Sequence, residues 1–282
     1  MNDHLKIGIM SGRLSLPINN KIQSFPKDSW KSEFMLAKQC GFETIEWIVD
    51  HTNNPIFTNE GIREIKTLSH TNDIQINTLL ADYFMEHLLF NISMTEKEKN
   101  FSLLKKIIEQ CYKLEISVVE IPLVDTSSLK KNKNKLDFIR NLSKIIEFAT
   151  SYNVKITLET DLSPIDFKSL LQNLGKDIGA NYDTGNSASL GYDVIQELEL
   201  LKTWLTNIHL KDRLLGGDTV PFGMGCTNFD LFFQKLSKIN YTGELIIQGA
   251  RQEKISPLST CKSYLDFIKI YANKHLIPIR NS

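Results

Sequence analysis

The sequence lacks a long hydrophobic run, paired cysteines and an excess of charge of one sign. No stretch approaches the roughly 18 consecutive apolar residues of a membrane-spanning helix, and the first residues do not have the pattern of a signal peptide. We therefore expect a cytoplasmic protein with no membrane partner. The 33 basic and 33 acidic residues cancel, so net charge gives no reason to expect nucleic acid as a partner. The four cysteines are widely spaced with no C-x-x-C pair, which argues against a structural zinc site and a disulfide framework.

What is present is an ordinary globular composition. The chain has 282 residues, of which 41% are hydrophobic and 23% charged, and this is enough to bury a sizeable core. No internal repeat and no linker rich in Pro, Gly or Ser divides it. We therefore expect one domain over residues 1–282.

Short apolar runs with a composition typical of strands recur along the whole chain. Eight of them stand out, and they are separated by longer amphipathic segments. The runs are 5–12, 43–49, 75–81, 116–123, 155–160, 178–183, 207–211 and 244–249.

The segments between these runs have apolar residues at every third or fourth position, which predicts helices. An alternation of eight strands and eight helices at this length favours an α/β fold, the (β/α)8 TIM barrel. An open doubly wound sheet that binds a dinucleotide would carry G-x-G-x-x-G after its first strand, whereas residues 8–13 read GIMSGR. The predicted helices are 29–40, 59–71, 96–112, 134–152, 164–174, 193–203, 228–239 and 258–274.

In such a barrel the active site lies at the carboxyl ends of the strands. Four successive predicted strands, the fifth to the eighth, each place one polar residue there: Glu159, Asp183, His209 and Gln248. Two carboxylates, an imidazole and an amide oxygen suit a divalent ion such as Mn²⁺, Mg²⁺, Co²⁺ or Zn²⁺. Any one of these residues is weak evidence, but their coincidence on four neighbouring strands predicts a site for one metal ion.

Further polar residues follow other predicted strands at the same rim. We expect them to bind the hydroxyl groups of a substrate, although a ring of mutual salt bridges is the alternative for each. They are Glu46 after the second strand, Asp82 after the third, Asn186 after the sixth, and Lys211, Asp212 and Arg213 after the seventh.

Arginine is scarce in this chain, with six residues in all, and three of them fall at strand ends. Arg13 and Arg251 flank the first and last strands, which are neighbours in a closed barrel. With Arg213 they predict an anionic group, a phosphate or a carboxylate, on the substrate.

Several segments together resemble the xylose isomerase-like TIM barrel superfamily, a group of sugar and sugar-phosphate isomerases and epimerases, over nearly the whole chain. The most specific are DTGN on the sixth strand and IHLKD on the seventh. The remaining segments are GIMSGRLSLP, IQSFPKDSW leading to GFETIEWIVD, LETD, and FGMGCTNFD before GELIIQGAR.

The resemblance implies a divalent ion held by Glu159, Asp183, His209 and, with a substitution, Gln248, where the family has a second glutamate. It also implies that Glu159 is the base that removes a proton next to a carbonyl. A glutamine can coordinate an ion, but it cannot act as a base. The remaining choices are an isomerase with one base, or an epimerase whose second proton comes from Asp161, Asp212 or water. Asp161 and Glu253 are also alternatives to Gln248 as a ligand.

Three other functions belong to the same set of resemblances. A nuclease of the endonuclease IV type needs many imidazoles, and only His209 clearly lies at a strand end here, which argues against it. An inosose dehydratase-like lyase would use the same metal and the same proton abstraction. A barrel that binds a sugar without turnover would account for Gln248. By resemblance we also expect a homodimer.

Overall fold

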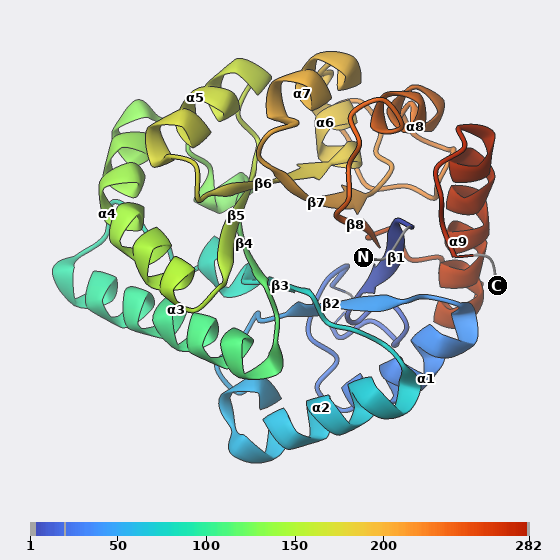
Figure 1. The fold of residues 1–282 in the computed structure, drawn as a ribbon, viewed down its shortest axis with the longest axis horizontal. Coiled ribbons are helices and arrows are strands. Elements are labelled where there is room, and N and C mark those ends of the chain that lie inside the picture. The colour runs from blue at the N-terminus through green and yellow to red at the C-terminus, as the bar shows by residue number, and fades with distance from the viewer. Residues whose placement is uncertain (1–3, 20, 281–282) are drawn as a thin grey trace.

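The eight strands form a closed parallel barrel in the order β1 to β8, with β8 pairing back to β1. The computed structural model describes residues 4–19 and 21–280, so the ends of the predicted 1–282 domain lie outside the described residues. Figure 1 looks into the ring of strands, with the helices around its outside. The predicted TIM barrel is confirmed. The strands are β1 Lys6–Met10, β2 Thr44–Ile48, β3 Thr78–Leu80, β4 Val118–Leu123, β5 Lys155–Thr160, β6 Gly179–Asp183, β7 Leu205–Leu210 and β8 Glu244–Ile247.

All eight predicted helices are present, with ends that differ by at most three residues from the prediction. One α-helix, α6, was not predicted. Short 3₁₀ helices follow β2, β3 and β4: η1 Pro55–Phe57, η2 Asp82–Met85 and η3 Asp125–Ser127. The α-helices are α1 Trp30–Cys40, α2 Asn59–Asn72, α3 Met94–Leu114, α4 Asn132–Ser151, α5 Pro164–Leu174, α6 Thr184–Leu190, α7 Val194–Leu201, α8 Phe229–Leu236 and α9 Pro257–Lys274.

The alternation of side chains along each strand separates an apolar outer layer from a polar interior. In β2, Trp47 points outward and packs against Trp30 of α1, with ring centroids 5.5 Å apart. Its neighbour Glu46 points inward and reaches His209 on β7. The barrel therefore keeps its apolar contacts between strands and helices and leaves polar groups at its centre.

Within the described residues, no helix is long and apolar enough to cross a membrane. Figure 1 shows β8 and β1 side by side, with α9 on the outside of the barrel beyond β1. The loops after β8 and β1 therefore lie together at the rim of the barrel, beside the first turns of α9.

Candidate active site

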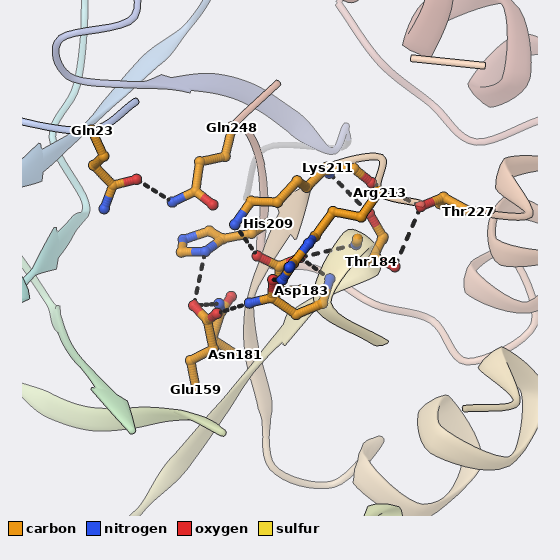
Figure 2. Close-up of polar contacts among 12 residues, drawn as sticks. Gln23, Glu159, Asn181, Asp183, Thr184, His209, Lys211, Arg213, Thr227 and Gln248 are labelled. Atoms are coloured by element: carbon orange, nitrogen blue, oxygen red, sulfur yellow. Dashed lines mark hydrogen bonds and ion pairs between the residues drawn. The ribbon is translucent and has the colours of Figure 1, made fainter. Parts of the chain in front are cut away.

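The ends of β5, β6 and β7 bring three of the predicted ligands together. Glu159, Asp183 and His209 each offer one ligand atom, and these atoms lie within 4.8 Å of one another. Asp183 and His209 are paired in register across β6 and β7, and His209 Nδ1 lies 3.2 Å from Glu159 Oε2. All three side chains are buried. Figure 2 shows them converging from their separate strands.

Asp183 divides its two carboxylate oxygens between two tasks. Its Oδ1 accepts hydrogen bonds from the backbone N–H groups of Gly185 (2.9 Å) and Asn186 (2.8 Å), and so caps the N-terminus of α6. Its Oδ2 lies 2.8 Å from Nζ of Lys211. A Cβ atom at position 185 would come within 2.8 Å of the Lys211 side chain, so glycine is needed there for Lys211 to approach.

The Glu159 carboxylate is held by two asparagines. Asn186 Nδ2 donates to Oε1 at 2.6 Å, and Asn181 Nδ2 donates to Oε2 at 3.1 Å. Burial by itself would raise the pKa of Glu159, but the close approach and charge of His209, together with the charge of Lys211, lower it to about 2. Glu159 is therefore ionised and fixed in position at neutral pH. The sequence predicted Asn186 at this site but not Asn181.

A second layer of buried carboxylates lies on the other side of His209. Its Nε2 is 2.8 Å from Glu46 Oε2 and 3.5 Å from Glu120 Oε2. Asn207 Nδ2 donates to Glu46 at 2.9 Å and to Glu120 at 3.1 Å. This corrects the placement of Glu46, which lies inside β2 and faces the barrel interior rather than following the strand at the rim.

The buried groups of this layer shift the pKa values of one another. Burial opposes a charged imidazole, yet Glu120, Glu46 and Glu159 together raise the pKa of His209 well above its ordinary value. Burial raises the pKa of Glu120 well above its ordinary value, against the opposing charge of His209. Both shifts favour the protonated form of the group concerned, and they reduce the number of unpaired buried negative charges, which are costly inside a protein. Glu120 was missed from the sequence, although a lone carboxylate inside the apolar run 116–123 was the available signal.

Gln248 is linked through Gln23 to Asp82. Gln248 Nε2 donates to Gln23 Oε1 at 2.7 Å, and Gln23 Nε2 lies 3.4 Å from Asp82 Oδ1. Burial, followed by the charges of Asp50 and Glu159, raises the pKa of Asp82 to about 6. Figure 2 shows the Gln23–Gln248 pair beside His209. Gln23 was not predicted as a site residue.

A cavity of about 270 Å³ opens above this cluster, and we call it the sugar cavity. Glu159, Gln248, Asp82, Lys211 and Arg213 are among its lining residues, as is Asn186. Arg213 Nη1 donates to Asn186 Oδ1 at 2.8 Å, and its Nε and Nη2 donate to the carbonyl of Gly217. Most of the predicted rim residues therefore line one cavity.

Asp212, which was predicted to bind substrate at the rim, instead binds backbone groups of a loop. Its carboxylate accepts hydrogen bonds from the backbone N–H groups of Gly223, Gly225 and Thr227, at 2.9, 2.9 and 3.0 Å. It fastens the loop between β7 and α8, is fully buried and is not among the residues that line the sugar cavity, so its position does not support the predicted role in substrate binding or proton supply. The sequence could not reveal these backbone partners.

The alternatives to Gln248 as a ligand also lie elsewhere. Asp161 accepts from Ser128 Oγ at 2.7 Å and pairs with Lys130 at 3.1 Å. Glu253 lines a different cavity, described below. Neither carboxylate belongs to the cluster of ligand atoms around His209.

Arg13 and Arg251 lie together, as predicted, but neither is among the residues that line the sugar cavity. Arg251 donates to the carbonyls of Gly12, Ser15 and Ile22 at 2.8, 2.8 and 3.2 Å. Arg13 Nη1 also donates to the carbonyl of Ile22. The two guanidinium groups therefore fasten the loop after β1.

The donor set fits a divalent cation. Buried polar atoms without a hydrogen-bond partner include Asp183 Oδ2, His209 Nδ1 and Gln248 Oε1, and each belongs to a predicted ligand. Two of these atoms nevertheless lie close to a charged group. Asp183 Oδ2 is near Lys211 and His209 Nδ1 is near Glu159, but the geometry of neither pair meets the requirements of a hydrogen bond. Buried polar atoms without a partner are rare in folded proteins, and two of these three, Asp183 Oδ2 and His209 Nδ1, belong to the residues that converge with Glu159, which fits a site for a cation.

The sequence and the fold of the chain resemble those of known proteins. The model of the xylose isomerase-like TIM barrel family matches residues 34–268. A relative from Haemophilus influenzae, named "Putative L-ribulose-5-phosphate 3-epimerase SgbU", is 26% identical over 258 residues, covering 84% of this chain and 89% of the relative. D-psicose 3-epimerase from Clostridium cellulolyticum H10 superimposes with a TM-score of 0.76 at 14% identity, covering 95% and 99% of the two chains. The IOLI protein with a bound zinc atom superimposes with a TM-score of 0.77 at 16% identity, covering 95% of this chain and 99% of the IOLI chain.

Proposed function

The chain belongs to the xylose isomerase-like TIM barrel family, and on that premise we propose that it is a divalent-metal-dependent epimerase of a sugar phosphate. Its reaction is the removal of a proton next to a carbonyl and the return of a proton to the same carbon. The observation that carries the proposal is the ionised, buried Glu159 that lines the sugar cavity and converges with Asp183 and His209, each of which has a buried polar atom without a hydrogen-bond partner.

Epimerisation is favoured over isomerisation by the relatives. Several carry the name L-ribulose-5-phosphate 3-epimerase, among them the Shigella flexneri protein, 22% identical over 259 residues. A ketopentose phosphate is therefore the substrate class we propose. The lyase reaction has no comparable support among these relatives.

Glu159, Asp183, His209 and Gln248 would hold the metal ion. When bound, the ion polarises the substrate carbonyl and stabilises the negative charge that develops on its oxygen. His209 is suited to this position because Glu46 accepts at Nε2, which leaves Nδ1 facing Glu159 and Asp183.

Glu159 is the base in this proposal. Asn181 and Asn186 fix both oxygens of its carboxylate, so little reorganisation is needed before it accepts the proton. Its low pKa means that it is unprotonated when the substrate arrives. The acidity of the substrate C–H must therefore be increased by the electrophilic groups that face the carbonyl.

An epimerase also needs a second proton-transfer group, and Gln248 cannot supply one. We propose Asp82 for this role. It lines the same cavity as Glu159, it has no cation within 4 Å among the described residues, and Gln23 connects it to Gln248. The other candidates from the sequence, Asp161 and Asp212, are engaged with Lys130 and with the β7–α8 loop.

The test is a panel of ketopentoses and their 5-phosphates, incubated in D₂O with the protein supplied with Mn²⁺, Mg²⁺, Co²⁺ or Zn²⁺. We expect deuterium at C3 and formation of the C3 epimer for at least one phosphate. A protein that binds the metal and the sugar phosphate but exchanges no C–H proton would instead be a binding protein, the alternative that Gln248 leaves open.

A further inference from the structure

A second cavity, of about 390 Å³, lies at the rim between the loops after β1 and β8 and the first turns of α9. Arg13, Arg251 and Thr260 line it, together with apolar side chains such as Ile9 and Ile247. Among the described residues it shares no lining residue with the sugar cavity. We call it the arginine cavity.

The arginine cavity is lined by a buried arginine, Arg13, a half-buried arginine, Arg251, and one exposed carboxylate, Glu253. Arg13 is only 5% exposed, and within the described residues neither Arg13 nor Arg251 has a carboxylate within 4 Å. Burial and the charge of Arg251 lower the pKa of Arg13 to about 10, so it is still protonated at neutral pH. Buried charges in proteins are normally paired, whereas the hydrogen bonds of these two guanidinium groups go to backbone carbonyls and to the uncharged amide of Gln23.

Two hydrogen-bonding groups of this cavity have no partner. Arg13 Nε and Thr260 Oγ1 are buried and make no hydrogen bond. The adjacent Nη2 of Arg13 has only a long contact of 3.5 Å to Gln23 Oε1, so the Nε–Nη2 edge that binds anions in a bidentate manner is nearly free. Thr260 lies in the first turn of the 18-residue helix α9, where the helix dipole also favours negative charge.

We propose that the arginine cavity binds the anionic group of a small molecule, a phosphate or a carboxylate, with Arg13 and Thr260 donating to its oxygens. The apolar walls would accommodate the uncharged remainder of the ligand. The anion can belong to the substrate itself or to a separate metabolite. That the anion belongs to the substrate rests on the proposed function, whereas binding of a separate metabolite does not.

Binding is tested with inorganic phosphate, titrated into the full chain by calorimetry and followed by ³¹P line broadening. Arg13→Gln removes a charge and should weaken phosphate binding about 10- to 100-fold. Thr260→Val keeps the side-chain shape and should weaken phosphate binding about 2- to 10-fold. Arg140→Gln removes an exposed arginine, and Arg213→Gln removes an arginine of the sugar cavity. Both should leave the affinity unchanged. Thermal unfolding of each variant checks that it is folded.

The proposal is overturned if the wild-type chain binds no phosphate, if Thr260→Val and Arg13→Gln bind it as the wild type does, or if Arg213→Gln alone abolishes binding. These outcomes do not depend on turnover, so they are separable from a failure of the proposed function.

A second measurement distinguishes the two sources of the anion. If it is the phosphate of the substrate, inorganic phosphate inhibits competitively, and Thr260→Val raises KM for the ketopentose phosphate but not for the free ketose. If it belongs to a separate metabolite, phosphate binding is not displaced by the substrate, and the KM values are unchanged.

Discussion

His209 Nε2 on β7 lies 2.8 Å from Glu46 Oε2 on β2, across the interior of the barrel, and both side chains are completely buried. This contact fixes the imidazole and directs Nδ1 towards Glu159 and Asp183. A carboxylate in this position raises the basicity of a ligating histidine and holds its ring in place. Glu46 is therefore a positioning residue for the metal site, and it was predicted for substrate binding instead.

We predict that Glu46→Gln weakens divalent metal affinity about 10- to 100-fold, because outer partners of ligating histidines contribute on that scale. Metal affinity is measured by competition with a chelating dye. Glu64→Gln, a change on the surface of α2, is the matched control and should bind metal as the wild type does. Equal affinities for wild type and Glu46→Gln would show that Glu46 does not act through His209.

Gln248→Glu should bind the divalent ion about 10- to 100-fold more tightly, because a full negative charge replaces an amide oxygen at the site. The same chelator competition measures this change. Gln252→Glu adds the same charge beside the arginine cavity and should leave the affinity as it was. An unchanged affinity in Gln248→Glu would remove Gln248 from the ligand set.

The variant Asp82→Asn should separate exchange of the substrate proton with solvent from formation of the epimer. If Asp82 returns the second proton, the variant still exchanges the substrate proton through Glu159, but formation of the epimer falls by about 100-fold or more. NMR follows both rates in one sample. Asp125→Asn alters an exposed carboxylate that lines the same cavity, so it serves as the control. A parallel loss of exchange and conversion in Asp82→Asn would contradict the assignment.

The raised pKa of Glu33 predicts that the free energy of unfolding depends on pH. It is buried on α1, where it accepts hydrogen bonds from Gly12 N and Ser15 Oγ, and burial raises its pKa from 4.5 to about 7. Between these values the unfolded chain ionises while the folded chain keeps the proton. The contribution of Glu33 to stability is therefore greatest below pH 4.5 and is lost as the pH rises through 7.

Glu33→Gln should remove this dependence. In the wild type, ionisation of Glu33 should lower the free energy of unfolding by about 3 kcal/mol between pH 4.5 and 8, and the variant should lack this decrease. The free energy of unfolding is measured in urea at several pH values. Glu60→Gln, an exposed change on α2, should follow the wild-type curve. If the Glu33→Gln and wild-type curves run parallel, the carboxyl of Glu33 titrates normally in the folded state.

The sequence was sufficient for the barrel because its strands and helices have clear periodicities, and α5 was predicted with its bounds, 164–174. It was not sufficient for α6, where TGNSASL has no apolar stripe and the helix depends on the cap from Asp183. Residue type at strand ends located the cluster of Glu159, Asp183 and His209. It could not show which charged groups face the cavity.

Arg251 and Asp212 illustrate this limit. Both lie at strand ends, yet their hydrogen bonds go to backbone groups of neighbouring loops, and such partners depend on loop conformation rather than on residue type. Glu120 illustrates the reverse case, because it lies in the middle of an apolar run and its partners come from β6 and β7.

The most direct test of the account is deuterium incorporation at C3 of a ketopentose 5-phosphate in D₂O, compared between the wild type and Glu159→Gln at saturating metal. The account predicts exchange by the wild type and a loss of at least about 100-fold in the variant. Exchange at the same rate in both proteins would contradict the assignment of Glu159 as the base.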